Sequence, residues 1–390
     1  MRIKQDDDQY SLVAQTLQGL EQILAEEIKA LGGDNIEVLK RAVRFRGSAT
    51  TMMKTNLWCR TAIRISAEIN HFKIRNAQDL YDHVYKLPWA KLMNEKDTFI
   101  VTPIVKSPIF RNTLFAAQKT KDAVVDKIRK YHGNRPSIDK TNPTFRILIK
   151  INDNECSVLL DSSGDILFKR GYRQRSFVAP LNECLAAGLV MLSDWDTESD
   201  LLDPFCGSGT IAIEAALIAC NIPPNFLRRH FGFMDWEDYE HDLWKSVKTD
   251  AVQSKKSSDI KIYAFDKYWK AIEQVRENAV KAGCADIIVS KKKDFFEING
   301  PIGNVRTVIT NPPYDERIGL HDAEVFYKEI GDQLKNNFID QSIWILSSNL
   351  DALKSVGLRP SRRIPLFNGA LESKFVNYQM YKGSKKQKYQ

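Results

Sequence analysis

A short segment near the middle of the chain combines an acid and two glycines at the end of an apolar run. Residues 201–210 read LLDPFCGSGT, and residues 211–219 are apolar at nearly every position. This pattern predicts a buried strand, a tight turn and a buried helix, and Gly207 and Gly209 would let the backbone approach a ligand closely. The turn has neither the lysine of a phosphate-binding loop nor G-x-G-x-x-G spacing. Asp203 therefore suits a ligand with an ammonium group or hydroxyls rather than a pyrophosphate.

A second polar segment follows another apolar run. Asn311-Pro312-Pro313-Tyr314 comes directly after residues 305–310, which predict a strand. The two prolines stiffen the loop and bias Asn311 toward extended backbone. The Asn311 side-chain oxygen and the Pro312 carbonyl can each accept a hydrogen bond from an amine, and Tyr314 can stack on a planar ring. Taken alone, the segment could also be a proline-rich turn with a packing tyrosine.

Together the two segments resemble a known pair of motifs. The octet D-P-F-C-G-S-G-T resembles motif I of class I methyltransferases that use S-adenosyl-L-methionine (SAM), and N-P-P-Y resembles motif IV of enzymes that methylate exocyclic or amide nitrogens. A tight turn in some other α/β protein is the alternative for a short motif alone. The resemblance implies a cofactor site at Asp203, Pro204, Phe205, Gly207, Ser208, Gly209 and Thr210. It implies catalytic roles for Asn311, Pro312, Pro313 and Tyr314.

Three further acids are candidates for cofactor binding. Asp266 follows a predicted strand at residues 260–265 and could accept the ribose hydroxyls, although a helix N-cap is also a common role for aspartate. By resemblance, Asp294 would contact the adenine amine. Glu183 matches the acid of the family's A-P-L-x-E segment, and it could equally be a first-turn helix acid.

Composition limits the classes of protein that the chain can belong to. The 390 residues suggest two or three domains. The sequence contains no run of about 18 consecutive apolar residues, so no membrane span is predicted. The polar, acidic start is unlike a secretory signal, so none is expected. Six scattered cysteines without a C-x-x-C pair predict a reduced, cytoplasmic protein without a metal site.

The net charge of +8 is concentrated in one part of the chain. Residues 106–150 hold 11 Lys and Arg against three Asp, and residues 111–131 predict a long helix. This basic stripe predicts an RNA-binding surface, with a solvated helix face as the alternative. The candidate RNA contacts are Arg111, Lys119, Lys127, Lys130, Arg170, Arg173 and Arg317.

The order of four segments extends the resemblance over most of the chain. They match S-G-x-x-L-x-x-R-G-Y-R, A-P-L-x-E, D-P-F-C-G-S-G-T and N-P-P-Y, as in bacterial THUMP-containing guanine-N2 RNA methyltransferases. The implied fold is α/β: a C-terminal Rossmann-like domain with a doubly wound, mostly parallel sheet, after α+β ferredoxin-like and THUMP domains. The expected limits are 1–70 for the ferredoxin-like domain, 71–162 for THUMP, 163–385 for the methyltransferase domain and 386–390 for a basic tail. Residues 221–259, which include Trp236, Tyr239 and Trp244, are expected to form a helical insertion that packs on the methyltransferase domain.

The resemblance implies methylation of a guanine N2 amine in RNA, with 23S ribosomal RNA as the expected target. The alternatives are a guanine in tRNA, another amino group such as adenine N6 or a protein glutamine, or an RNA-binding assembly factor with a vestigial SAM site. The sequence leaves open which nucleotide is modified and the oligomeric state.

Overall fold

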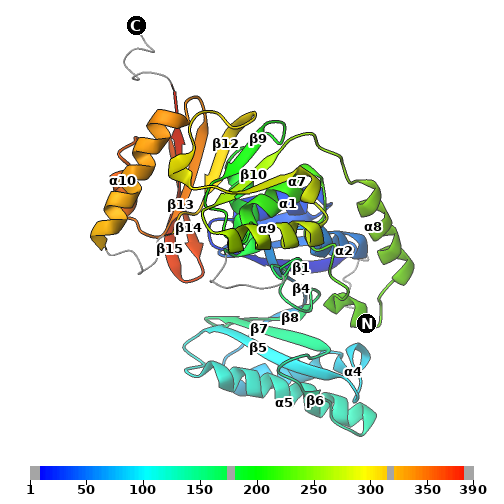
Figure 1. Ribbon diagram of the computed structural model, residues 1–390. Coiled ribbons are helices and arrows are strands. Elements are labelled where there is room, and N and C mark those ends of the chain that lie inside the picture. Colours follow the sequence, from blue (N-terminus) through cyan, green and yellow to red (C-terminus); the bar gives the residue numbers. More distant parts are fainter. Residues whose placement is uncertain (1–8, 174–180, 314–319, 382–390) are drawn as a thin grey trace. The chain divides into compact units, whose positions relative to one another are not determined.

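The structure is a computed structural model that describes residues 9–173, 181–313 and 320–381 (Figure 1). The chain divides into two compact units. The first takes in the residues up to Thr16, Leu24–Leu167 and Arg228–Asp250, and the second takes in Leu17–Ile23, Phe168–Leu227 and the residues from Ala251 on.

One eight-stranded sheet organises the first unit, in the order β2-β3-β1-β4-β8-β7-β5-β6. The longest strand, β4, pairs with β1 on one side and β8 on the other, so the ferredoxin-like and THUMP strands share a sheet. The strands are β1 (Tyr10–Thr16), β2 (Asp34–Leu39), β3 (Ala42–Gly47), β4 (Ala62–Lys73), β5 (Thr98–Lys106), β6 (Ser137–Ile138), β7 (Phe145–Asn152) and β8 (Glu155–Asp161).

Three helices of the first unit begin at polar caps. Ser48, Asn76 and Asn112 each accept a backbone N–H from the first turn, as expected for N-cap residues. The helices are α2 (Ala49–Trp58), α3 (Ala77–Lys86), α4 (Trp89–Leu92) and α5 (Thr113–His132). Two more, α1 (Glu21–Ala30) and α8 (His241–Gln253), each contain a boundary between the units.

Residues 228–250 belong to the first unit, although they follow the glycine turn in sequence. The Arg228 guanidinium donates to the carbonyls of Ser163, Asp165 and Ile166. The Tyr10 hydroxyl donates to the Asp238 carboxylate at 3.0 Å. The expectation that the insertion packs on the methyltransferase domain is therefore wrong for these residues, which include the short helix η1 (Gly232–Asp235).

A seven-stranded sheet organises the second unit, in the order β11-β10-β9-β12-β13-β15-β14. The pairs among β11, β10, β9, β12 and β13 are parallel, and β15 is antiparallel to both neighbours. This confirms the doubly wound, mostly parallel sheet. The strands are β9 (Asp200–Asp203), β10 (Ile262–Asp266), β11 (Ile288–Lys292), β12 (Val305–Thr310), β13 (Ser342–Ser347), β14 (Arg362–Asn368) and β15 (Leu371–Gln379).

Helices cover both faces of this sheet, with α10 on one face and α7 and α9 on the other (Figure 1). The α7 helix is apolar on nearly every side, because it is buried between the sheet and its neighbours. The helices are α6 (Glu183–Leu192), α7 (Thr210–Ala219), α9 (Trp269–Ala282), α10 (Leu320–Asn337), η2 (Ala285–Ile287), η3 (Phe295–Glu297) and η4 (Ala352–Val356). The strand order reverses between β9 and β12, and such a switch point is where doubly wound sheets bind ligands.

Candidate active site

The glycine turn joins β9 to α7 at the switch point. Gly207 and Gly209 have φ values of 51° and 81°, which favour glycine. A Cβ at Gly209 would lie 3.0 Å from the Val275 side chain, so the turn packs tightly against α9 at this position. A Cβ at Gly207 would meet no atom of the described residues within 4 Å. Gly207 therefore faces open space, where a ligand could contact the backbone.

Hydrogen bonds from β10 and α9 hold the turn. The Asp266 carboxylate accepts from the Gly207 N–H at 3.0 Å, and the Asn278 amide donates to the Ser208 carbonyl at 3.1 Å. Asn278 is 2% exposed, and the sequence reasoning missed it. The sequence feature that could have revealed Asn278 is its spacing: it lies three residues after Val275 and six after Ile272, on the buried face of α9.

Asp203 is a buried acid at the end of β9. Burial raises its pKa to about 8, and the negative charge of Asp266 adds to the shift. The Phe205 N–H donates to the carboxylate at 3.3 Å, which is a weak hydrogen bond. A cationic ligand group would favour the ionised form. The site is therefore suited to an ammonium group.

The other two acids lie at the same edge of the sheet. Asp266 also accepts from the Tyr268 N–H at 2.9 Å, but the N-cap of α9 is Tyr268, so Asp266 is not that cap. Asp294 caps η3 by accepting from the Phe296 N–H at 3.0 Å. Since a carboxylate can accept about four hydrogen bonds, both acids keep capacity for a ligand.

Asn311 follows β12, which pairs with β9 through Val308 and Leu202. Its side-chain oxygen Oδ1 is buried and accepts no hydrogen bond within the described part of the chain. Leaving a buried acceptor unpaired costs about 1–3 kcal/mol, so this atom fits a donor supplied by a ligand. Pro312 is buried and Pro313 exposed, while Tyr314 and Arg317 lie outside the described residues.

Family comparisons agree with this geometry. The model of the RMKL-like methyltransferase domain matches residues 170–377, that of the RlmL ferredoxin-like domain matches 11–66, and that of the THUMP domain matches 75–161. The chain belongs to the RMKL-like methyltransferase family. The RlmL-type resemblance and the three-part fold are thereby confirmed.

Solved structures extend the likeness over almost the whole methyltransferase. SMU.472, whose crystal structure is a complex with SAH (S-adenosylhomocysteine), is 30% identical, with 97% of this chain and 100% of that chain covered and a TM-score of 0.85. A possible methylase from Clostridium difficile 630 is 29% identical over 97% and 100% of the chains, with a TM-score of 0.87. A predicted N6-adenine-specific DNA methylase from Listeria monocytogenes is 28% identical over 95% and 96%, with a TM-score of 0.85.

These matches make the chain a SAM-dependent methyltransferase whose THUMP domain implies RNA binding. The space at Gly207 and the buried Asp203 fit the cofactor, and the Asn311 oxygen, which accepts no hydrogen bond from the described residues, fits a ligand donor. Among the described residues, no cluster of acids, histidines and cysteines could hold a metal ion. No helix in the described ranges has the length and apolar character needed to cross a membrane. All six cysteines are free and buried.

Two of the methyltransferase's candidate RNA contacts lie elsewhere than expected. The Arg170 and Glu214 side chains are both fully buried, with 3.5 Å between Nε and Oε1, and the Tyr172 hydroxyl also donates to Glu214. Burial alone would lower the pKa of Arg170, but Glu214, together with smaller contributions from Cys184, Tyr172 and Glu183, raises the pKa above its usual value. Arg170 is thus an internal ion-pair residue, and its assignment to RNA binding is corrected. Glu214 is an acid within the apolar helix α7, and this sequence feature could have predicted a buried cation as its partner.

Arg173 is half-buried beside the glycine turn. Its Nε donates to Glu183 at 3.1 Å, and its Nη2 donates to the Thr210 hydroxyl at 3.1 Å and to the Leu181 carbonyl at 3.2 Å. Burial raises the pKa of Glu183, while Arg173 opposes the rise. This pair positions the start of α6 against the start of α7, so Arg173 is a positioning residue rather than part of an exposed basic surface.

The basic stripe of the THUMP domain lies on and beside α5. Arg111 and Lys130 are exposed, and Lys119 and Lys127 are half-buried. The Lys127 ammonium lies 5.1 Å from the ring centres of both Tyr85 and Tyr131. Cations beside aromatic rings are suited to nucleic acid, because phosphates and bases can both be contacted.

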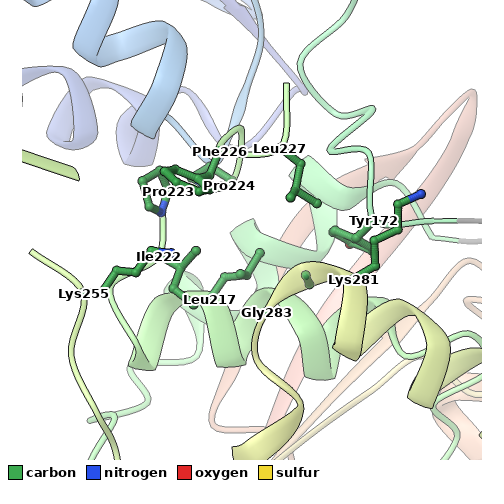
Figure 2. A pocket seen from close by; sticks show the side chains of 11 residues that line it. Tyr172, Leu217, Ile222, Pro223, Pro224, Phe226, Leu227, Lys255, Lys281 and Gly283 are labelled. Atoms are coloured by element: carbon green, nitrogen blue, oxygen red, sulfur yellow. The ribbon is translucent and has the colours of Figure 1, made fainter. Parts of the chain in front are cut away.

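A small pocket lies away from the glycine turn (Figure 2). It measures about 120 Å³ and is mainly apolar, with Pro223 and Pro224 opposite Leu217. Residues 222–227 supply much of its wall, together with the C-terminal ends of α7 and α9, whereas the cofactor residues lie at the beginnings of these helices. The pocket is therefore not the cofactor site.

Proposed function

We propose that this methyltransferase transfers the SAM methyl group to the exocyclic N2 amine of a guanine in RNA, with 23S ribosomal RNA as its target. The observation that carries the proposal is the buried Asn311 oxygen at the switch point, which accepts no hydrogen bond from the described residues. An exocyclic amine can donate a hydrogen bond to this acceptor. The THUMP match and the basic stripe support RNA as the substrate.

SAM, when bound, supplies an electrophilic methyl group. The protein's own contribution is to position the acceptor. Asn311 Oδ1 and the Pro312 carbonyl accept the two amine hydrogens, which directs the nitrogen lone pair away from the base ring. Accurate positioning of this kind can lower a barrier by about 7–11 kcal/mol. The target base must be unpaired or flipped out of its helix to reach such a site.

A second acceptor, adenine N6, carries the same amine chemistry. The Listeria protein named as an N6-adenine-specific DNA methylase is 28% identical. Nucleoside mass spectrometry of RNA and DNA from a strain that lacks the gene separates the two acceptors. Loss of N2-methylguanosine from 23S RNA supports the proposal. Loss of the same nucleoside from tRNA would mean that the target is a tRNA and not 23S RNA. Loss of N6-methyladenine overturns the guanine assignment.

The proposal includes a domain arrangement and a location. We assign residues 1–70 to the ferredoxin-like domain, 71–162 to THUMP, 163–385 to the methyltransferase domain and 386–390 to a basic tail, in a cytoplasmic protein. Within the site, Asp203 and residues 204–210 bind the methionine end of the cofactor, Asp266 its ribose and Asp294 its adenine.

SAH binding is expected to release a proton and to strengthen as pH rises toward 8. Burial raises the pKa of Asp203 to about 8, so the free protein holds this group protonated below that pH. Pairing with the ligand's ammonium requires the carboxylate form, so affinity should rise by up to about tenfold per pH unit and level off near pH 8. Calorimetry in buffers of different ionisation enthalpy measures the released proton. Asp203→Asn should bind more weakly without proton release, and a pH-independent wild-type affinity would remove the ammonium role of Asp203.

RNA binding is expected to depend on the basic stripe. Lys119→Glu, Lys127→Glu and Lys130→Glu together should weaken RNA binding and flatten its dependence on salt, because fewer counterions are released. SAH affinity should not change. Lys335→Glu, on α10, is the matched control. RNA affinity equal to wild type in the triple variant would show that the stripe is only a solvated helix face.

A further inference from the structure

Two large aromatic side chains are exposed at the carboxyl edge of β10. Tyr268 is 65% exposed and Trp269 48% exposed, and they follow Asp266 at the start of α9. Neighbouring exposed aromatic rings on a protein surface indicate a binding site more often than isolated ones do. Residues of this methyltransferase that lie so close to its cofactor acid are well placed to contact the substrate.

Neighbouring side chains hold both rings. The Trp269 indole Nε1 donates to Glu273 at 2.9 Å, and the Arg276 guanidinium lies 5.1 Å from its ring centre. The Lys267 ammonium lies 5.3 Å from the Tyr268 ring centre. Because these contacts already restrict the two side chains, the side chains lose less conformational entropy when a base stacks on them.

Lysines gather beside these rings. Lys292 on β11 is in register with Asp266, and the Lys293 N–H donates to the Asp266 carbonyl at 3.0 Å. Residues 267–293 hold seven Lys and Arg against three acids. Lys267, Lys270, Lys291 and Lys292 are all exposed. The edge of the sheet therefore combines stacking surfaces with positive charge.

We infer that Tyr268, Trp269 and residues 291–293 form a binding surface for single-stranded RNA on the methyltransferase unit itself. Bases stack on the two rings and phosphates contact the lysines. The surface lies at the same sheet edge as Asp203 and Asn311, so it would hold the strand next to the acceptor base. The inference rests on the proposed function, because it supplies the substrate contact that the cofactor site lacks.

Fluorescence anisotropy with a short fluorescein-labelled single-stranded RNA tests the surface in the full-length protein. Tyr268→Ala with Trp269→Ala should weaken binding about tenfold or more, since each stacked base contributes substantially. Lys291→Ala, Lys292→Ala and Lys293→Ala together should lower the salt slope by about 2, as about 0.7 is expected per phosphate contact. Val280→Ala is the matched control, because Val280 is 70% exposed near the other end of α9.

SAH calorimetry on the same variants separates the alternatives. Unchanged SAH affinity with weakened RNA binding supports the inference, including when the methylated nucleoside is not N2-methylguanosine. Weakened SAH affinity with normal RNA binding would mean that the rings contact the cofactor's adenosine, and the surface would be rejected. RNA binding equal to wild type in both multiple variants also rejects it, even where guanine methylation is found.

Discussion

Asn311→Ala is expected to lower the methyl-transfer rate by about 10²–10³-fold, by analogy with the removal of a hydrogen bond that acts in the transition state. The Asn311 Oδ1 atom is buried and unpaired among the described residues, so the variant loses an acceptor without breaking a hydrogen bond to any of these residues. Folding and SAH affinity should stay close to wild type. Single-turnover methylation with saturating SAM and RNA measures the effect on the chemical step.

Asn304→Ala is the matched control for this experiment. Asn304 is an exposed asparagine directly before β12, at the opposite end from Asn311. Its replacement should leave the rate unchanged. If Asn311→Ala also methylates RNA at the wild-type rate, the amide only shapes the turn before Pro312, and the proposed positioning of the amine is wrong.

Arg170→Met is expected to lower the free energy of unfolding by about 3–5 kcal/mol, because it leaves the Glu214 carboxylate buried without its cation. Both side chains are fully buried, so water cannot replace the lost partner. Urea unfolding followed by circular dichroism measures the change. Arg170→Met with Glu214→Leu should recover most of the stability, since apolar replacement of a whole buried pair is often tolerated.

This variant also separates the two roles considered for Arg170. Arg111→Met, at an exposed arginine beside the basic stripe, is the control and should leave stability unchanged. If Arg170→Met instead unfolds like wild type and loses only RNA affinity, Arg170 is a surface contact and the buried arrangement is incorrect.

The glycine turn shows how much of the site depends on local sequence. The positive φ values of Gly207 and Gly209 are required by the turn itself, so the motif could be recognised from neighbouring residues. The amide that holds the Ser208 carbonyl comes from a helix some 70 residues further along the chain. Only packing of α9 against the turn brings this amide to the site.

The sequence alone determined the α/β alternation, the glycine turn and the asparagine loop, because strand and helix periodicity and glycine backbone freedom are local properties. The doubly wound sheet was expected from the family resemblance, and the structure supplies its strand order. Tertiary structure decided where the charges lie. Arg170 and Arg173 were expected to contact RNA, yet Arg170 is fully buried against Glu214, and Arg173 is half-buried against Glu183. Residues 228–250 likewise join the first unit through contacts with Tyr10 and the carbonyls after β8. The burial of a charge and the placement of an insertion depend on partners far away in sequence, and those partners meet only when the chain has folded.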